Sequence, residues 1–241
     1  MTRAYWRTSV GKTIRLNESD WENVWRESAW RKRQIEKLEN RDTCSSKFFA
    51  GLIGEKEGRK WLTEQGYEVC EFGMMEYYFK ELEDTANGLK RRRKQKYIEE
   101  DKIYISTLEH KLKGVFGEKF EGIRKFFCEF LQRKKEIKKE RRRTRRFAQY
   151  IGGFGPDFIV KKNNDFSFVE VKVNQSTLSN PQKACFEIAD RYGFKAFVLR
   201  VKVESNMPKD ICLKEFRNFH PEDLTEPENA YPTKSNTLKN K

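Results

Sequence analysis

The segment FSFVEVKV, residues 166–173, constrains the fold most strongly, because as an extended strand it has two chemically different faces. Phe168, Glu170 and Lys172 share one face, and the three valines share the other. The preceding DFIV (157–160) fits a second short strand, and the polar KKNND between them fits a turn. These residues therefore predict a β-hairpin.

A helix and another strand are predicted after the hairpin. NPQKACFEIADRY (180–192) begins with Asn180, a good N-cap residue, and Pro181 suits the first helical position. Gly193 is expected to end this helix, and KAFVLRVKV (195–203) is then a buried or half-buried strand.

An earlier helix and strand complete the pattern. We expect a helix from about Leu52 to Gln65, capped by Gly66, and then the short strand YEVCEF (67–72). In chain order the elements read αβ–ββαβ. The sequence therefore predicts an α/β fold with a small mixed β-sheet flanked by helices.

Three regions are predicted along the chain. Residues 1–47 form an N-terminal helical extension, based on the helical pattern of 17–40. Residues 48–204 form the main domain, which a large helical insertion (73–148) interrupts. Residues 205–241 are polar and proline-rich, and they are expected to be an extended or flexible tail.

The 73–148 segment combines an apolar helical face with a cationic end. Phe126, Phe127 and Phe130 fall at helical spacing, so part of the segment must bury a face. We expect two or three helices, and ten of residues 132–146 are Lys or Arg. Such a run is often only a solvated helix face or, in a eukaryote, a nuclear-localisation signal. Its one-signed charge favours contact with a phosphate backbone.

The predicted nucleic-acid contacts all lie in this cationic run. They are Lys134, Lys135, Lys138, Lys139, Arg141, Arg142, Arg143, Arg145 and Arg146.

The overall charge agrees with a polyanionic partner. The 241 residues include 51 Lys and Arg against 37 Asp and Glu, a formal net charge of +14. Nucleic acid is the expected partner and an anionic membrane surface a distant second, while a merely lysine-rich protein is the plain alternative.

Other features bear on location and metal type. The N-terminus lacks the pattern of a signal peptide and no segment is apolar enough to span a bilayer, so we expect a cytoplasmic or intracellular protein, nuclear if the host is eukaryotic. Five separated cysteines without a C-x-x-C pair, and only two histidines, predict reduced thiols and argue against structural zinc.

Four polar residues are predicted to converge in the hairpin region. Glu170 and Lys172 place a carboxylate beside an ammonium, the turn brings Asp157 near them, and Gln182 faces them from the first turn of the next helix. Two carboxylates and the backbone carbonyl of Val171 suit Mg²⁺, for which Mn²⁺ can substitute. A nearby lysine can orient water or stabilise charge on a phosphate. The alternative is a surface hairpin with a Glu–Lys pair worth at most about 1 kcal/mol.

The pattern GPDFIV…FVEVKVNQSTLSNPQ resembles the PD-(D/E)xK nuclease superfamily, most closely its VRR-NUC (virus-type replication-repair nuclease) members. Those members carry a G-x-P-D strand, then an E-V-K strand and then L-S-x-x-Q at a helix start. The matching residues are Gly155, Pro156, Asp157, Glu170, Val171, Lys172, Leu178, Ser179 and Gln182. The resemblance covers residues 152–203, about a fifth of the chain.

This resemblance implies a restriction-endonuclease-like αβββαβ core and a role for each site residue. Asp157 and Glu170 would bind the metal, Lys172 would be the catalytic lysine and Gln182 a supporting residue. The superfamily usually adds a glutamate from the first helix. Glu55 fits this role better than Glu57, although a solvated helix glutamate is the alternative for either.

Two functions follow as expectations. The first is a Mg²⁺-dependent nuclease that hydrolyses DNA phosphodiester bonds, structure-selective and of a repair, recombination or replication type. The second is a non-catalytic nucleic-acid-binding protein on a nuclease-like scaffold. DNA or RNA as substrate, endonuclease or exonuclease action and the structure preference stay open. The oligomeric state also stays open, a homodimer included, because the long 73–148 segment departs from the family pattern.

Overall fold

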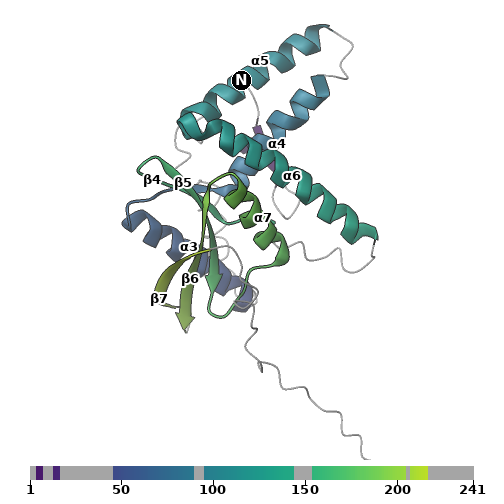
Figure 1. The fold of residues 1–241 in the computed structure, drawn as a ribbon. Helices are drawn as coiled ribbons and strands as arrows, with labels where there is room; N and C mark the ends of the chain where they lie inside the picture. Colours follow the sequence, from purple (N-terminus) through teal and green to yellow (C-terminus); the bar gives the residue numbers. More distant parts are fainter. Residues whose placement is uncertain are drawn as a thin grey trace, which may run out of the picture.

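The computed structural model describes residues 4–7, 13–16, 46–89, 95–143, 154–204 and 207–216. A five-stranded mixed sheet forms the centre, with helices on both of its faces (Figure 1). The predicted α/β class, with a small mixed sheet flanked by helices, is confirmed.

The strands lie in the sheet in chain order. They are β3 (Glu68–Glu71), β4 (Phe158–Lys162), β5 (Asp165–Val173), β6 (Lys195–Glu204) and β7 (Met207–Glu215). Neighbouring strands are antiparallel except β5 and β6, which are parallel. A parallel pair needs a crossover, and helix α7 (Asn180–Arg191) provides it.

The predicted β4–β5 hairpin is present and is closed by two asparagines. Asn163 and Asn164 have φ angles of 52° and 64°, and Lys162 pairs with Asp165 across the turn. Asparagine tolerates this left-handed conformation, and a two-residue turn of this kind matches the twist of the strands. The turn fixes the register, so the start of β4 lies beside the second half of β5.

Helix α3 (Ser46–Glu64) covers one face of the sheet and begins earlier than the predicted Leu52. It packs on the valine face of β5 and on neighbouring residues of β6. A Cβ atom at Gly54 would overlap with Val173, and one at Gly58 would lie 2.8 Å from Leu199 Cδ2. Glycine at these two positions therefore lets the helix backbone lie directly on the sheet.

The 73–148 segment supplies much of the other face. Its described part consists of α4 (Phe72–Leu89), α5 (Gln95–Phe116), a 3-10 turn (Gly117–Lys119) and α6 (Phe120–Arg143). These elements and α7 enclose one large apolar core together with the Phe168 face of β5.

Phenylalanine rings form the centre of this core. Phe127 stacks on Phe79 of α4 at 4.4 Å between ring centroids, and Phe126 lies 4.4 Å from Phe168 of the sheet. All four side chains are 0–1% exposed. The apolar face predicted around Phe126 is therefore confirmed, and the segment is a layer of the core rather than a separate appendage.

The C-terminal boundary predicted at residue 204 is wrong, because residues 207–215 form β7 instead of an extended tail. Ile211 and Leu213 pack toward the α3 face, while Asp210, Cys212 and Lys214 alternate with them. This period-two alternation is that of a strand with one buried face, and the segment pairs with β6 along its length.

The predicted N-terminal extension is described only in part. Strands β1 (Ala4–Arg7) and β2 (Thr13–Leu16) form a two-stranded antiparallel sheet within the predicted N-terminal extension. The helix predicted over 17–40 lies outside the described residues. No helix in the described ranges has an apolar stretch of the length needed to cross a bilayer.

The phenylalanine packing generates a stability prediction. Phe127→Ala is expected to lower the free energy of unfolding by about 3–5 kcal/mol, because it leaves a cavity between α4 and α6 that the rigid neighbouring rings cannot fill. Urea unfolding followed by circular dichroism measures the change.

Ile103→Ala is the matched control, because Ile103 is 66% exposed. Its expected effect is within about 0.5 kcal/mol. Equal losses from the two variants would contradict this packing.

Candidate active site

Asp157 is held by three hydrogen bonds to backbone groups of two elements, β5 and α4. Its N–H donates to Val169 O of β5 at 3.0 Å, and its carbonyl accepts from the N–H of Phe72, the first residue of α4, at 3.0 Å. Its carboxylate oxygen Oδ2 accepts from the N–H of Val171 at 2.8 Å. The side chain is thereby fixed at the edge where β4 begins.

Gly155 makes this position of Asp157 possible. A Cβ atom there would overlap with the ring of Phe72, which is 1% exposed and packs against Phe126, Phe130 and Phe168. The ring therefore cannot move aside. The glycine before P-D is required by this close approach to the helical layer.

Glu170, Lys172 and Gln182 form a closed triangle of side-chain hydrogen bonds. Lys172 Nζ donates to Glu170 Oε1 at 2.8 Å and to Gln182 Oε1 at 3.0 Å. Gln182 Nε2 donates to Glu170 Oε1 at 2.5 Å. The amide thus satisfies the carboxylate and the ammonium together, and it fixes both on the α7 side of the sheet.

The start of α7 holds Gln182 in this orientation, and it differs from the prediction. The N-cap is Ser179 rather than Asn180, and Ser179 and Gln182 form a reciprocal capping box. Ser179 N donates to Gln182 Oε1 at 3.0 Å. The S-x-x-Q spacing is the sequence signal that identifies this cap.

Burial leaves one carboxylate oxygen of Glu170 without a partner. Glu170 is 4% exposed, and its Oε2 accepts no hydrogen bond within the described residues. Burial raises the pKa of Glu170 to about 7, against the opposing effect of the Lys172 ammonium, and the charge of Glu55 raises it further. An unsatisfied buried carboxylate oxygen costs stability, so its retention points to a ligand.

The two candidate helix glutamates differ in their relation to the site. The charge of Glu55 acts on Glu170, which brings this α3 residue within electrostatic range of the triangle. Glu57 shows no corresponding effect on Glu170. Among the residues that the structure describes, no three His, Cys, Asp or Glu side chains form a ready metal-binding group.

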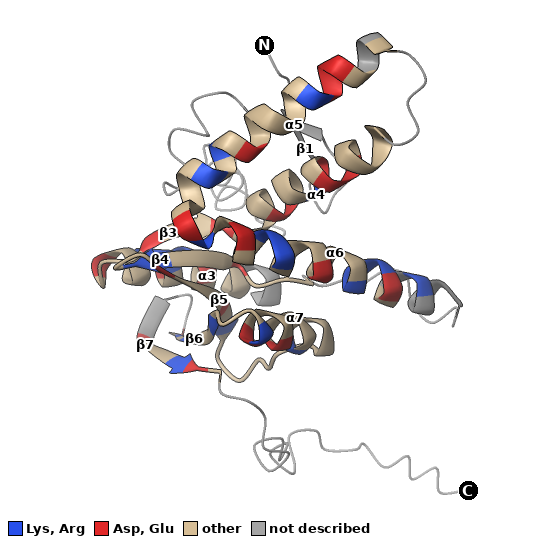
Figure 2. Ribbon diagram, turned by 45° about the horizontal axis from the view of Figure 1, so that its top comes forward, with Lys and Arg blue, Asp and Glu red and all other residues tan. Residues whose placement is uncertain are grey.

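The cationic run of α6 is only partly described. Lys135 and Lys139 are exposed. Lys138 and the arginines at 141–143 lie on α6, but their side chains are outside the described set, and Arg145 and Arg146 lie outside the described residues. Figure 2 shows Lys and Arg along the C-terminal half of α6.

Lys134, one of the predicted nucleic-acid contacts, is largely covered by neighbouring side chains. It is 19% exposed, pairs with Glu76 of α4 and lies over the rings of Phe130 and Phe154. Burial and the nearby carboxylates of Glu76 and Glu170 raise the pKa of the Cys185 thiol, so the Glu76–Lys134 pair flanks the α7 side of the site. Lys134 therefore anchors the cationic helix to α4.

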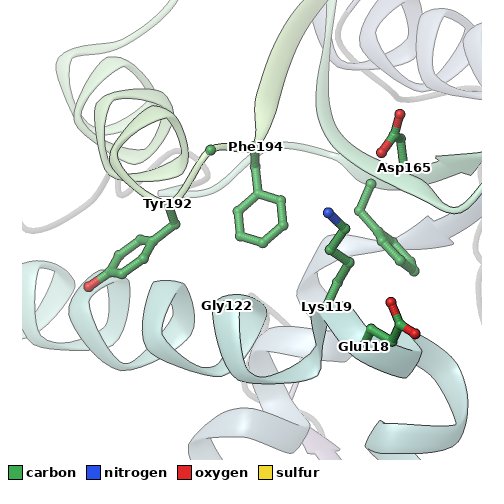
Figure 3. A pocket seen from close by; sticks show the side chains of 8 residues that line it. Glu118, Lys119, Gly122, Asp165, Tyr192 and Phe194 are labelled. Atoms are coloured by element: carbon green, nitrogen blue, oxygen red, sulfur yellow. The ribbon is translucent and has the colours of Figure 1, made fainter.

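A surface pocket lies at the opposite end of β5 from Lys172. Its lining residues include Glu118, Lys119, Asp165, Tyr192 and Phe194, and Lys119 and Phe194 point into it (Figure 3). None of the predicted site residues lines it. It is therefore separate from the Asp157–Glu170–Lys172–Gln182 cluster.

Comparisons with known proteins do not add to this geometry. The sequence matches no protein-family model, no curated protein and no solved structure.

Gly155→Ala is predicted to destabilise the protein by about 1–3 kcal/mol, because overpacking forces Phe72 and Asp157 apart. Urea unfolding measures the change. Replacing Phe72 by Leu in the same chain should recover part of the loss relative to Gly155→Ala.

Gly114→Ala on α5 is the control, since a Cβ there meets no atom within 4 Å. It should stabilise the helix by up to about 1 kcal/mol. A neutral effect of Gly155→Ala would show that the contact with Phe72 is not limiting.

Glu170 predicts an unusual pH dependence of the metal-free protein. An unfolded glutamate loses its proton near 4.5, whereas folded Glu170 keeps it to about 7. Between these pH values the unfolded state binds fewer protons, so the free energy of unfolding falls as pH rises. The loss relative to Glu170→Gln, which does not titrate, is at most about 3 kcal/mol.

Urea unfolding in EDTA at a series of pH values compares the two proteins. The difference between wild type and Glu170→Gln should change through this pH window. Parallel pH profiles would contradict the elevated pKa of Glu170.

Proposed function

We propose that this protein is a Mg²⁺-dependent nuclease that hydrolyses phosphodiester bonds in DNA. The observation that carries the proposal is the bond of Asp157 to the Val171 N–H, between two members of the Glu170–Lys172–Gln182 triangle, in which a buried carboxylate oxygen has no hydrogen-bond partner among the described residues. A structural Glu–Lys pair does not require this oxygen to stay buried and unsatisfied.

The donor atoms in the site fit a hard divalent cation. Asp157 and Glu170 would hold it through carboxylate oxygens, which Mg²⁺ and Mn²⁺ prefer. The Val171 carbonyl is a third donor, because the N–H and C=O of one strand residue point to the same side and the Val171 N–H bonds to Asp157. Glu55 is close enough to add charge from α3. When bound, the ion would activate a water and polarise the phosphate.

Lys172 is suited to act on the reacting phosphate. Two of its three N–H donors are used by Glu170 and Gln182, which leaves one to bind a water or a phosphate oxygen. Its fixed ammonium would stabilise negative charge that develops as the phosphodiester is attacked. Gln182 is a positioning residue, since it holds Lys172 and Glu170 in register.

The chain order of the elements also supports a nuclease core. Helix α3, strands β3, β4 and β5, helix α7 and strand β6 follow one another as αβββαβ. The long helical segment between β3 and β4 brings α6 beside α7, so the exposed cations of α6 can bind the substrate backbone near the triangle.

The second candidate is a nucleic-acid-binding protein without activity. The cations of α6 would serve either function. A protein that only binds a polyanion has no use for Asp157 and the buried Glu170 at its binding surface, because negative charge there weakens binding, and this favours the enzyme.

Lys172→Ala is predicted to reduce Mg²⁺-dependent cleavage by about 10²–10⁴-fold, as expected when one positioned proton donor or acceptor is lost. Asp157→Ala should lose cleavage as well. Cleavage of single-stranded, duplex, flap and four-way-junction DNA, each with Mg²⁺ or EDTA, measures the effect and gives the structural preference.

Lys195→Ala is the control, because Lys195 is exposed at the far end of β6. It should cleave like wild type. If Asp157→Ala and Lys172→Ala also cleave like wild type, the active-site assignment is wrong. Salt-sensitive binding without cleavage by the wild type would favour the binding protein.

A further inference from the structure

Strand pairing extends the face that carries Lys172 across the rest of the sheet. Lys172 of β5 pairs with Arg200 of β6, and Arg200 pairs with Cys212 of β7. Directly paired residues point to the same face, so all three share the face that carries the triangle. Beyond α7 this face has polar side chains, while the opposite face packs on α3.

Two more cations belong to this face. Lys202 lies two residues after Arg200 on β6, and Lys214 of β7 pairs with Val198, two residues before Arg200. Both lysines are exposed. We propose that Arg200, Lys202 and Lys214, the β6–β7 basic face, bind the phosphates of a nucleic-acid strand that extends from the active site.

Arg200 connects this face to the active-site loop. Its Nη1 donates to Asn174 O at 3.2 Å and to Ser176 O at 3.1 Å, in the loop that joins β5 to α7. Asn174 in turn pairs with the backbone of Val203, its Oδ1 accepting from Val203 N at 2.8 Å. The described residues provide no other acceptor for the guanidinium, so Nη2 and Nε remain for a phosphate.

Two acids lie beside Lys202 on this face. Lys202 pairs with Glu204 at 2.8 Å, with both side chains largely exposed, 61% and 43%, and the exposed Asp210 of β7 lies opposite Lys202. An exposed pair of this kind contributes little and can be exchanged for a phosphate. Lys214 makes no ion pair with any described residue. The chain's net charge of +14 also favours an anionic partner.

The position of α7 makes this face distinct from the cations of α6. Helix α7 contacts α6 on one side and β6 on the other, and its N-terminal turn carries Gln182 (Figure 1). A strand bound to both basic surfaces would therefore pass over the triangle and continue on each side. This inference rests on the proposed function, because it names the path of the substrate through that site.

The first test measures binding without cleavage. Affinity for a fluorescein-labelled oligothymidylate is followed by anisotropy in EDTA at several salt concentrations, for wild type and for Lys202→Gln/Lys214→Gln. Two lost phosphate contacts should lower the slope of log K against log salt by about 1.4 for a single strand. Arg200→Lys, which keeps the charge but loses the fork, should bind more weakly than wild type.

A matched control loses the same charge elsewhere. Lys60→Gln/Lys102→Gln removes two exposed lysines from α3 and α5 and should keep the wild-type slope. If the two double variants bind alike, the proposal is wrong. Unchanged binding with new self-association of Lys202→Gln/Lys214→Gln would also overturn it, because the lysines would then protect the edge strand β7.

The second test uses the native thiol on the same face. Cys212 is exposed and lies opposite Arg200, so a bound strand should slow its alkylation by iodoacetamide. The alkylation is carried out in EDTA, and peptide mass spectrometry follows Cys212, with the partly buried Cys128 as reference. Unchanged alkylation of Cys212 with saturating oligonucleotide would overturn the inference. A failure to observe cleavage would contradict the proposed function but not this inference, because both tests are read in EDTA and measure binding alone.

Discussion

The packing of Phe72 is the contact on which most of the structure depends. This residue is the first of α4, and its ring is enclosed by Phe126, Phe127 and Phe130 of α6 and by Phe168 of β5. Its N–H also binds the carbonyl of Asp157. One residue therefore joins the helical layer, the sheet and the loop that carries an acidic site residue. Glycine is the only residue type that allows this approach at position 155 without displacing the ring.

The site combines this rigid support with an electrostatic cost. Glu170 lies in the apolar layer that Phe168 helps to form, and burial raises its pKa. Lys172 and Gln182 satisfy one of its oxygens, and the other has no partner in the part of the chain that the structure describes. Such a group lowers the stability of the folded protein, and a cation bound there would recover that loss. This balance is typical of a functional site rather than of a structural ion pair.

Charge is distributed around the site according to the same layers. The triangle lies at the N-terminal turn of α7, the exposed lysines of α6 lie on one side of that helix, and Arg200, Lys202 and Lys214 lie on the other.

The sequence by itself determined the local elements of the site. Strand parity put Glu170 beside Lys172, the asparagine turn fixed the hairpin, and the first turn of α7 aimed Gln182 at the sheet, because each depends on short-range geometry. The S-x-x-Q cap and the alternation in β7 were also present in the sequence, but weaker local signals, a polar tail and a competing Asn-Pro cap, obscured them.

Only the tertiary structure decided the long-range pairings. It made the 73–148 segment a layer of the core, turned Lys134 inward toward Glu76 and brought Arg200 beside Lys172. Periodicity reports which face of an element is apolar, but not which distant element covers it. That choice follows from the combined packing of all the layers, where phenylalanine rings far apart in the chain fill one shared space.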